Sequence, residues 1–345
     1  AAALPSRTRQ SQTINCPQGN RFSLANPPAV SYSAANTEPP GLSVLGAILA
    51  VLSAASFALN NAAARRGVVT GTPIQGMAIS IPMGVVCFLP VVAVIGELGR
   101  LTQFPAMAAA LMAGVGVLHF VFGRYCNYSA NQAAGVNLTA PVIQLQVIVT
   151  LVLAVAILHE PCTLLQALGG VLIVTGSIIT QQGSATRPAA TAENRKVPVF
   201  TPSKLKGYVF ASLAALAYGS SPIPARFALE HTGPGTGILG GLIAYAAATA
   251  FVAVAMLSAP LRRDVLALKA ENIRWFAYSG VFVAMAQGFF FAAVSVAPVL
   301  LVMPILQLSL VFRFLFSAWL NPHHEVFGPP VLIGIATSIT GALMV

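Results

Sequence analysis

Long apolar stretches alternate with short polar segments along the chain from Gly41 onward. A helix needs about 20 predominantly apolar residues to cross the hydrocarbon core of a bilayer, and these stretches have that length. They lack the strict alternation of barrel strands, so helices are the expected spanning elements. Ten spans are predicted, at residues 41–63, 72–95, 104–128, 134–157, 161–182, 206–229, 234–259, 275–296, 298–320 and 327–345.

Two polar segments stand apart from the predicted spans. Residues 1–40 are rich in Ser, Asn, Pro and Ala and contain no apolar run long enough for the core of a signal peptide. We expect a disordered polar tail there, because such a segment buries too little apolar surface to offset its ordering entropy. Its Ser-rich, acid-poor composition is also similar to an organelle transit peptide. Residues 183–205 form a polar basic linker that separates residues 41–182 from residues 206–345.

The two groups of five spans carry matching residues in matching order, which indicates an internal repeat. One sequence offset relates His159-Glu160 to His324-Glu325, Gly169 to Gly334, Thr175 to Thr340, and Gly176 to Gly341. A slightly shorter offset relates Pro141 to Pro304 and Gln144 to Gln307, and one shorter still relates Ala64-Arg65 to Ala225-Arg226. Because five is an odd number, the second group enters the bilayer from the opposite side. The sequence thus predicts an all-α polytopic membrane protein with ten transmembrane helices as two inverted five-helix repeats. Such repeats are typical of secondary transporters, which bind their substrate near the midplane between the halves.

Composition supports a membrane protein and excludes a soluble enzyme. The chain is 57% hydrophobic and 8% charged, whereas a soluble domain is about 45–50% apolar and about 25% charged. Its mean hydropathy is +0.81. Basic loops held on one face of a membrane account for the net charge of +10, and no aromatic-and-basic motif indicates a nucleic-acid partner. The four cysteines show no paired spacing, so we expect neither disulfides nor a metal site. We also expect no cofactor.

One stretch of the second half has a familiar pattern. Residues 214–226 read AALAYGSSPIPAR, and this resembles the opening helix of the EamA repeat in the drug/metabolite transporter superfamily. A proline inside the fourth helix of each half, a Glu junction and a Gly-rich fifth helix are similar to the same repeat. The resemblance covers both halves and implies a ten-helix carrier that works by alternating access. The first half departs from the pattern, since residues 56–61 read SFALNN where the family usually has an aromatic–Gly pair.

Apart from Arg226 in the last turn of its span, two arginines lie inside predicted spans, where an ionisable group is costly and is a functional hypothesis by default. Arg124 shares a helix face with Tyr128, one turn farther along, and Arg313 lies in the middle of its span. A guanidinium stays protonated and suits carboxylate or phosphate. The alternative for Arg124 is that its side chain reaches the membrane surface, and for Arg313 it is a structural partner on another helix.

Amides and hydroxyls supply further candidates for substrate binding. Gln144 and Gln307 each follow a repeat proline, Pro141 or Pro304, by nearly one helical turn, and a glutamine can donate to and accept from a polar ligand. Equally, such glutamines can join helices by hydrogen bonds. The weaker candidates are Gln287, which matches Arg124 at the same offset as the glutamine pair, and Asn60 and Ser220, near the ends of the first helix of each half.

Other matched residues are expected to be structural. Glu160 and Glu325 stand at junctions between spans, where a carboxylate stabilises a helix start, although a role as a proton carrier is the alternative. The neighbouring histidines lack the spacing of a zinc-protease motif. Small residues two turns apart on one face let helices approach closely, and they are Gly169, Gly176, Gly334 and Gly341.

These residues favour a secondary-active or facilitative carrier over an enzyme. No acidic residue lies inside a predicted span, which disfavours the cation–proton antiport of the small multidrug transporters, and two embedded arginines favour an anionic or zwitterionic solute. We expect a small polar, amino-acid-like metabolite, exported by alternating access, with coupling to protons or a counter-solute left open. The alternatives are a membrane-embedded enzyme, which needs clustered acids, bases or metal ligands, and a non-transporting scaffold. No Gly-x4-Gly-Lys loop indicates ATP-driven transport.

The orientation in the membrane is left open by the sequence. Beyond the tail, the loops on the linker side carry eleven Lys and Arg residues, and those on the side of the termini carry two. The positive-inside rule therefore places the termini outside, whereas the superfamily usually has both termini in the cytoplasm. A multi-pass protein of a bacterial inner membrane is expected, with an organelle membrane as the alternative.

Overall fold

The computed structural model describes residues 40–68, 71–134, 139, 142–185, 203–230, 232–309, 311–312, 316 and 329–344. Within these residues the chain forms helices and no strands. The expected tail and most of the linker, together with Pro141, Arg313 and Glu325, lie outside the described residues. The helices of the first half are α1 (Pro40–Val68), α2 (Pro73–Val94), η1 (Glu97–Gln103), α3 (Ala106–Val115), η2 (Gly116–Gly123), α4 (Arg124–Ala134), α6 (Gln146–Ile157) and α7 (Leu164–Ala185). Those of the second half are α8 (Lys204–Ser220), α9 (Pro222–Leu229), α10 (Pro234–Ala255), α11 (Ala259–Leu266), α12 (Ala270–Val296), α13 (Val299–Leu306) and α15 (Pro329–Leu343).

Within the residues that the structure describes, five helical segments are long and apolar enough to cross a bilayer. They are Leu42–Ala64, Pro73–Val94, Ala106–Ala134, Pro234–Ala255 and Ala270–Val296. Shorter apolar helices occupy Gln146–Ile157, Leu164–Gly176 and Leu332–Gly341. The described chain is therefore an all-helical integral membrane protein, and the remaining five of the ten predicted spans stay a prediction.

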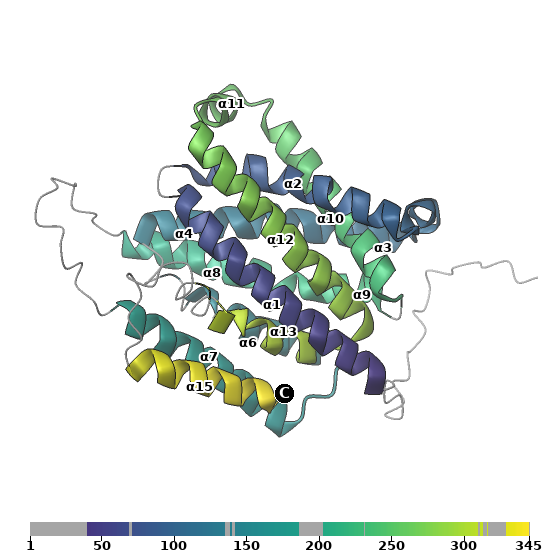
Figure 1. Ribbon diagram of the computed structural model, residues 1–345, viewed down its shortest axis with the longest axis vertical. Helices are drawn as coiled ribbons and strands as arrows, with labels where there is room; N and C mark the ends of the chain where they lie inside the picture. Colours follow the sequence, from purple (N-terminus) through teal and green to yellow (C-terminus); the bar gives the residue numbers. More distant parts are fainter. Residues whose placement is uncertain are drawn as a thin grey trace, which may run out of the picture. The chain divides into compact units, whose positions relative to one another are not determined.

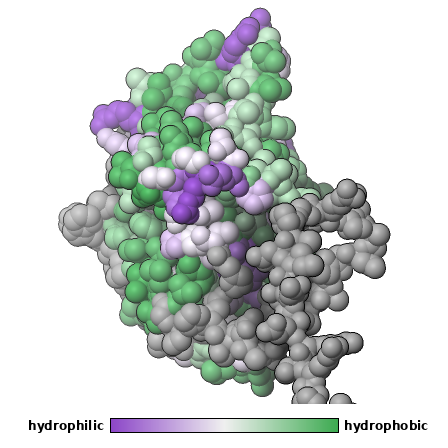
Figure 2. Space-filling view, turned by 90° about the vertical axis from the view of Figure 1, so that its right-hand side faces the viewer, coloured by the Kyte–Doolittle hydropathy of each residue, from purple (hydrophilic) through white to green (hydrophobic). Residues whose placement is uncertain are grey.

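The outer surface has the character that lipid-facing side chains require. In Figure 2, hydrophobic residues cover much of the coloured surface, and polar residues gather in an area near its middle and in smaller areas toward the top. Large apolar side chains point outward from several helices, for example Val86 on α2, Val152 on α6 and Val171 on α7. Many of the fully buried residues are alanines. Helices with small interior residues pack closely, which is the usual way in which membrane helices associate.

The main helix contacts run between the two halves of the chain. Helix α1 packs along α12, α4 packs along α8, and α7 packs along α15; the pairs α1–α12 and α7–α15 lie side by side in Figure 1. Gly46 of α1 abuts the Cβ atom of Ala297, just after α12, and Gly207 of α8 abuts the Cβ atom of Ala134 at the end of α4. The two glycines correspond to each other in the predicted internal repeat, and so do the two alanines. The same contact thus occurs twice: once with the glycine in the first half and the alanine in the second, and once the other way round.

Three local features differ from the predicted spans. The span expected at 206–229 is broken between α8 and α9, because Pro222 has no N–H to continue the hydrogen-bond ladder. The third span continues to Ala134 rather than ending at residue 128, and it contains the π-helix η2. The short helix α11 was not predicted; its exposed residues connect α10 to α12, and the Thr72 hydroxyl donates to Asp264 of α11 at 2.7 Å.

Glu160 caps a helix, but the helix belongs to the other half of the chain. Its Oε1 accepts from the N–H of Val299 at 3.0 Å and its Oε2 from the N–H of Leu300 at 2.9 Å, at the start of α13. His159 just before it has a φ of 53°, in the left-handed region, which costs a non-glycine residue about 1–2 kcal/mol. A strained turn therefore aims this carboxylate at α13 rather than at α7, which follows it in sequence.

The carboxylate of Glu160 also lies beside a buried arginine. The Arg226 Nε is 3.9 Å from Glu160 Oε1, and both side chains are almost fully buried. The same guanidinium donates to the carbonyl of Val294 at 2.8 Å and pairs with Glu230 at 3.3 Å. Burial raises the pKa of the Glu160 carboxyl, while the two backbone donors and Arg226 act in the opposite direction. The junction between α6 and α7 is thereby fixed to α9, α12 and α13.

We expect Glu160→Gln to destabilise the protein, because an amide has one oxygen for two backbone donors. Leaving one buried N–H without an acceptor costs about 1–3 kcal/mol. Thermal unfolding of the detergent-solubilised protein measures the loss. The matched control is Glu230→Gln, since that carboxylate pairs with the same arginine but its side chain is 28% exposed, and exposed pairs contribute about 0–1 kcal/mol. Equal losses in the two variants would contradict the capping role.

We expect Gly176→Ala and Gly341→Ala to separate α7 from α15. An ideal Cβ atom at Gly176 would lie 2.5 Å from the carbonyl oxygen of Gly334, and one at Gly341 would lie 2.5 Å from that of Gly169. Backbone atoms cannot move aside alone, so each change costs about 1–3 kcal/mol. The control is Gly170→Ala on α7, whose Cβ would meet only a methyl of Leu151. Unchanged melting temperatures in all three variants would show that α7 and α15 do not pack through these glycines.

Candidate functional site

A cluster of buried and half-buried polar and aromatic side chains lies where the third span meets helices of the second half. We call the central cluster the set formed by Ser80 of α2, His119 and Phe120 of η2, Arg124 of α4, Tyr218 of α8, Ser221, Tyr245 of α10 and Gln287 of α12. Along the Ala106–Ala134 segment, His119 lies almost as far from the first residue as from the last. Because a helix rises by a constant amount per residue, this places the cluster close to the middle of the span.

Arg124 places a positive charge in this interior. Only 6% of the residue is exposed, its Nη1 donates to the Ser80 hydroxyl at 2.9 Å, and its guanidinium carbon is 5.6 Å from the centre of the Phe120 ring. Among the described residues, no carboxylate pairs with it within 4.0 Å. Arg226 is the contrasting case, since it has two carboxylates nearby. A buried guanidinium with spare donors and no counter-charge can bind an anionic group.

His119 joins three helices through a directed chain of hydrogen bonds. The Ser221 hydroxyl donates to the carbonyl of Tyr218 at 3.1 Å, so its oxygen accepts from His119 Nδ1 at 2.7 Å. The other ring nitrogen, Nε2, then carries a lone pair and accepts from the amide of Gln287 at 3.1 Å. These contacts assign the neutral tautomer with its proton on Nδ1. Because His119 belongs to the first half and its two partners to the second, a proton or a ligand that alters either hydrogen bond alters the contact between the halves.

Aromatic rings enclose the cluster. The ring of Tyr245 stacks on that of Phe120 at 4.1 Å between centroids and lies 5.3 Å from that of Phe88. Tyr218 lies 4.7 Å from the His119 ring and accepts a long hydrogen bond of 3.5 Å from Asn127. The Tyr245 hydroxyl is fully buried without a hydrogen bond among the described residues, although it lies close enough to Arg124 to interact with its charge. The Tyr245 hydroxyl and the Arg124 guanidinium thus lie near each other, where both could donate to one bound ligand.

Two predicted residues, Arg124 and Gln287, belong to the central cluster. His119 and Phe120, which precede Arg124 in the chain, link them: His119 bonds to Gln287 and Phe120 lies under the guanidinium. Tyr128 is partly buried and packs against the hydrophobic core. Arg313 lies outside the described residues.

The other predicted residues lie away from the central cluster's hydrogen bonds. Asn60 accepts from the Ser279 hydroxyl at 2.6 Å, which joins α1 to α12. Ser220 donates to the carbonyl of Leu216 in its own helix. Gln144 is buried and accepts from Gln146 at 3.4 Å, and Gln307 is buried just after α13.

Sequence reasoning missed His119, Tyr218, Ser221 and Tyr245. A single histidine in an apolar run gives no spacing pattern, and the π-helix η2 shifts its residues off the 3.6-residue period. The one available signal was chemical, because His119 is an ionisable group inside a predicted span. In the part of the chain that the structure describes, no three His, Cys, Asp or Glu side chains gather in a way that could hold a metal ion.

Comparison with known proteins gives the family. A search of solved structures finds 26 matching chains; one, described as "Crystal structure of protein", has a TM-score of 0.62 and 14% identity over 88% of this chain and 96% of its own. At that identity the match shows the fold alone. No curated protein matches significantly. Residues 44–181, which contain Arg124 and His119, match the sequence model of the EamA-like transporter family. Through this segment the chain belongs to the EamA-like transporter family of the drug/metabolite transporter superfamily.

Proposed function

We propose that the protein carries a small anionic or zwitterionic solute across a membrane and binds it at the central cluster. The observation that supports this best is Arg124, which is buried near the middle of a span with no carboxylate partner among the described residues. A solute carboxylate would accept from the spare donors of the guanidinium and from the Tyr245 hydroxyl. The half-buried ring of Tyr218 would attract the ammonium group of an amino-acid-like solute.

The mechanism that we propose is alternating access between two inverted repeats of five spans each. The duplicated Gly46–Ala297 and Gly207–Ala134 contacts support it, as do the exchanged contacts of glycines across α7 and α15. In the described conformation Arg124 and Gln287 are buried, whereas His119 and Tyr218 are half-buried. Substrate entry therefore requires the halves to rock apart about the cluster, as in other inverted-repeat carriers.

The hydrogen bonds of His119 suggest how binding would couple to this movement. His119 and Arg124 belong to the first half, whereas Ser221 and Gln287 belong to the second. Arg124 follows directly after the π-helix η2, which carries His119. A solute that draws Arg124 away from Ser80 would therefore also displace His119 and change its hydrogen bonds to the second half. A lipid-processing enzyme would need a second acid or base beside His119, and the cluster holds no carboxylate among the described residues.

The test is solute flux in reconstituted liposomes, measured in both directions for amino acids, organic acids, sugar phosphates and cationic amines. We expect flux of a carboxylate-bearing solute, and we expect Arg124→Gln to lower its kcat/KM at least about 30-fold, because a buried charge pair is lost. Arg124→Lys, which keeps the charge but not the planar fork, should retain part of the flux.

The control variant is Arg100→Gln, an exposed arginine paired with Glu97 at 3.2 Å, which should transport like the wild type. Transport of the same solute by a folded Arg124→Gln protein at the wild-type rate would move the binding site elsewhere. Flux of cationic amines alone would overturn the proposed substrate class.

A further inference from the structure

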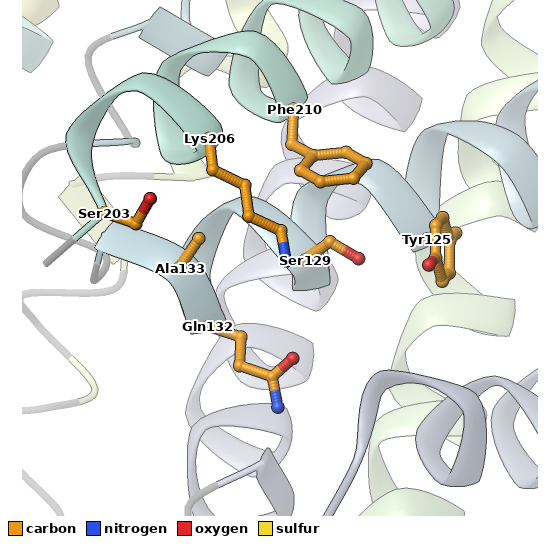
Figure 3. A pocket seen from close by; sticks show the side chains of 7 residues that line it. All are labelled: Tyr125, Ser129, Gln132, Ala133, Ser203, Lys206 and Phe210. Carbon is orange, nitrogen blue, oxygen red and sulfur yellow. The ribbon is translucent and has the colours of Figure 1, made fainter.

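A polar pocket lies between α4 and α8, and none of its lining residues belongs to the central cluster. It has a volume of ≈ 340 Å³ and is lined by Tyr125, Ser129, Gln132, Ala133, Ser203, Lys206 and Phe210. Figure 3 shows the Lys206 side chain reaching from α8 across the pocket toward Ser129 of α4, with the rings of Tyr125 and Phe210 farther along. Arg124 and Asn127, which serve the central cluster, are not among the lining residues. The pocket therefore uses a different face of α4.

Two backbone contacts between the helices hold the pocket walls in place. The N–H of Ser203 donates to the carbonyl of Ala133 at 2.9 Å, and Gly207 lies directly against Ala134. These contacts join the end of α4 to the first turn of α8. These contacts fix the two walls of the pocket, α4 and the first turn of α8, against each other.

The polar groups that line the pocket favour an anion. Among the described residues, no carboxylate pairs with Lys206. The first turn of α8 begins beside it, and the Ser203 side chain does not cap that turn, so backbone N–H groups with partial positive charge are available there. Ser129 lines the pocket and is only 9% exposed. Its hydroxyl makes no hydrogen bond with another described residue, so it can donate to a bound ligand.

The surroundings favour a lipid over a soluble anion. The rings of Tyr125 and Phe210 meet edge to face at 6.2 Å, and Tyr125 is 40% exposed. The neighbouring α8 side chains Leu205 and Val209 are also exposed. Aromatic rings beside a lysine at the end of a spanning helix are typical of the membrane–water interface. The pocket thus offers donors for a phosphate next to apolar surface for acyl chains.

We propose that this pocket binds an anionic phospholipid, with the phosphate held by Lys206 and the first turn of α8. The headgroup lies between Ser129 and Ser203, and the acyl chains run along Tyr125, Phe210 and the outer face of α8. Basic pockets between membrane helices bind anionic headgroups by this chemistry. Since α4 belongs to the first half and α8 to the second, the bound lipid braces the halves at one end. The inference does not rest on the transported solute.

Native mass spectrometry and thermal unfolding of the purified full chain test the proposal. The probes are phosphatidylglycerol, phosphatidylcholine, and inorganic phosphate at matched concentration. We expect phosphatidylglycerol to be retained and to raise the melting temperature, whereas phosphatidylcholine and inorganic phosphate do neither. Lys206→Gln should weaken phosphatidylglycerol binding about tenfold, because it removes a hydrogen bond to a charged group. Lys206→Arg should restore it.

The matched control is Lys204→Gln, which removes the same charge from the same helical turn at a residue that does not line the pocket. It should bind phosphatidylglycerol like the wild type. Equal loss in Lys204→Gln and Lys206→Gln would reduce the effect to general surface charge and overturn the site. If inorganic phosphate raised the melting temperature as much as phosphatidylglycerol, the proposal of a lipid ligand would be overturned and the pocket would be a phosphate site. Lys206 is exposed, so both variants should fold, and an unchanged melting temperature without lipid shows it.

Discussion

The close approach of the first helix of each half to the third span of the other is the contact on which the remaining structure depends. Gly46 meets Ala297 and Gly207 meets Ala134 without room for another carbon atom. These two contacts bring α12 beside α1 and α4 beside α8, and the central cluster forms between the helices so placed. The pocket that we propose binds a phospholipid lies next to the contact between Gly207 and Ala134. Because lipid tails offer no hydrophobic drive for helices to associate, such packing of small residues supplies much of the attraction.

The two buried arginines show how differently one side chain can be used in the same interior. Arg226 lies beside Glu160 and Glu230 and donates to a main-chain carbonyl, so its charge is compensated within the chain. Arg124 has a hydroxyl and a ring face for neighbours. Compensated charge holds elements together, whereas uncompensated charge is stable only if something from outside supplies the counter-charge for part of the cycle. The contrast supports a structural role for Arg226 and our proposal that Arg124 binds the solute.

Much of the helical framework could be predicted from the sequence, because apolar length alone identifies a spanning helix. The helices Pro73–Val94 and Pro234–Ala255 lie within the spans predicted at 72–95 and 234–259. The break before Pro222 had a signal in the sequence, because a proline cannot continue the hydrogen-bond ladder of a helix. The π-helix had none, since it depends on how the surrounding helices pack against it. Embedded charge led to Arg124, and repeat matching led to Gln287. Their connection through His119 was hidden, because it depends on how α8 and α12 cross the third span.

The helix cap at Glu160 has a consequence for how the protein is made. Its two backbone partners, Val299 and Leu300, belong to α13, near the end of the second half. When the first half has entered the membrane during synthesis, this carboxylate and the strained turn at His159 have no helix to hold. The helices of the first half must therefore remain incompletely packed until α13 has been synthesised, and that interval is when assistance from other membrane factors would matter most.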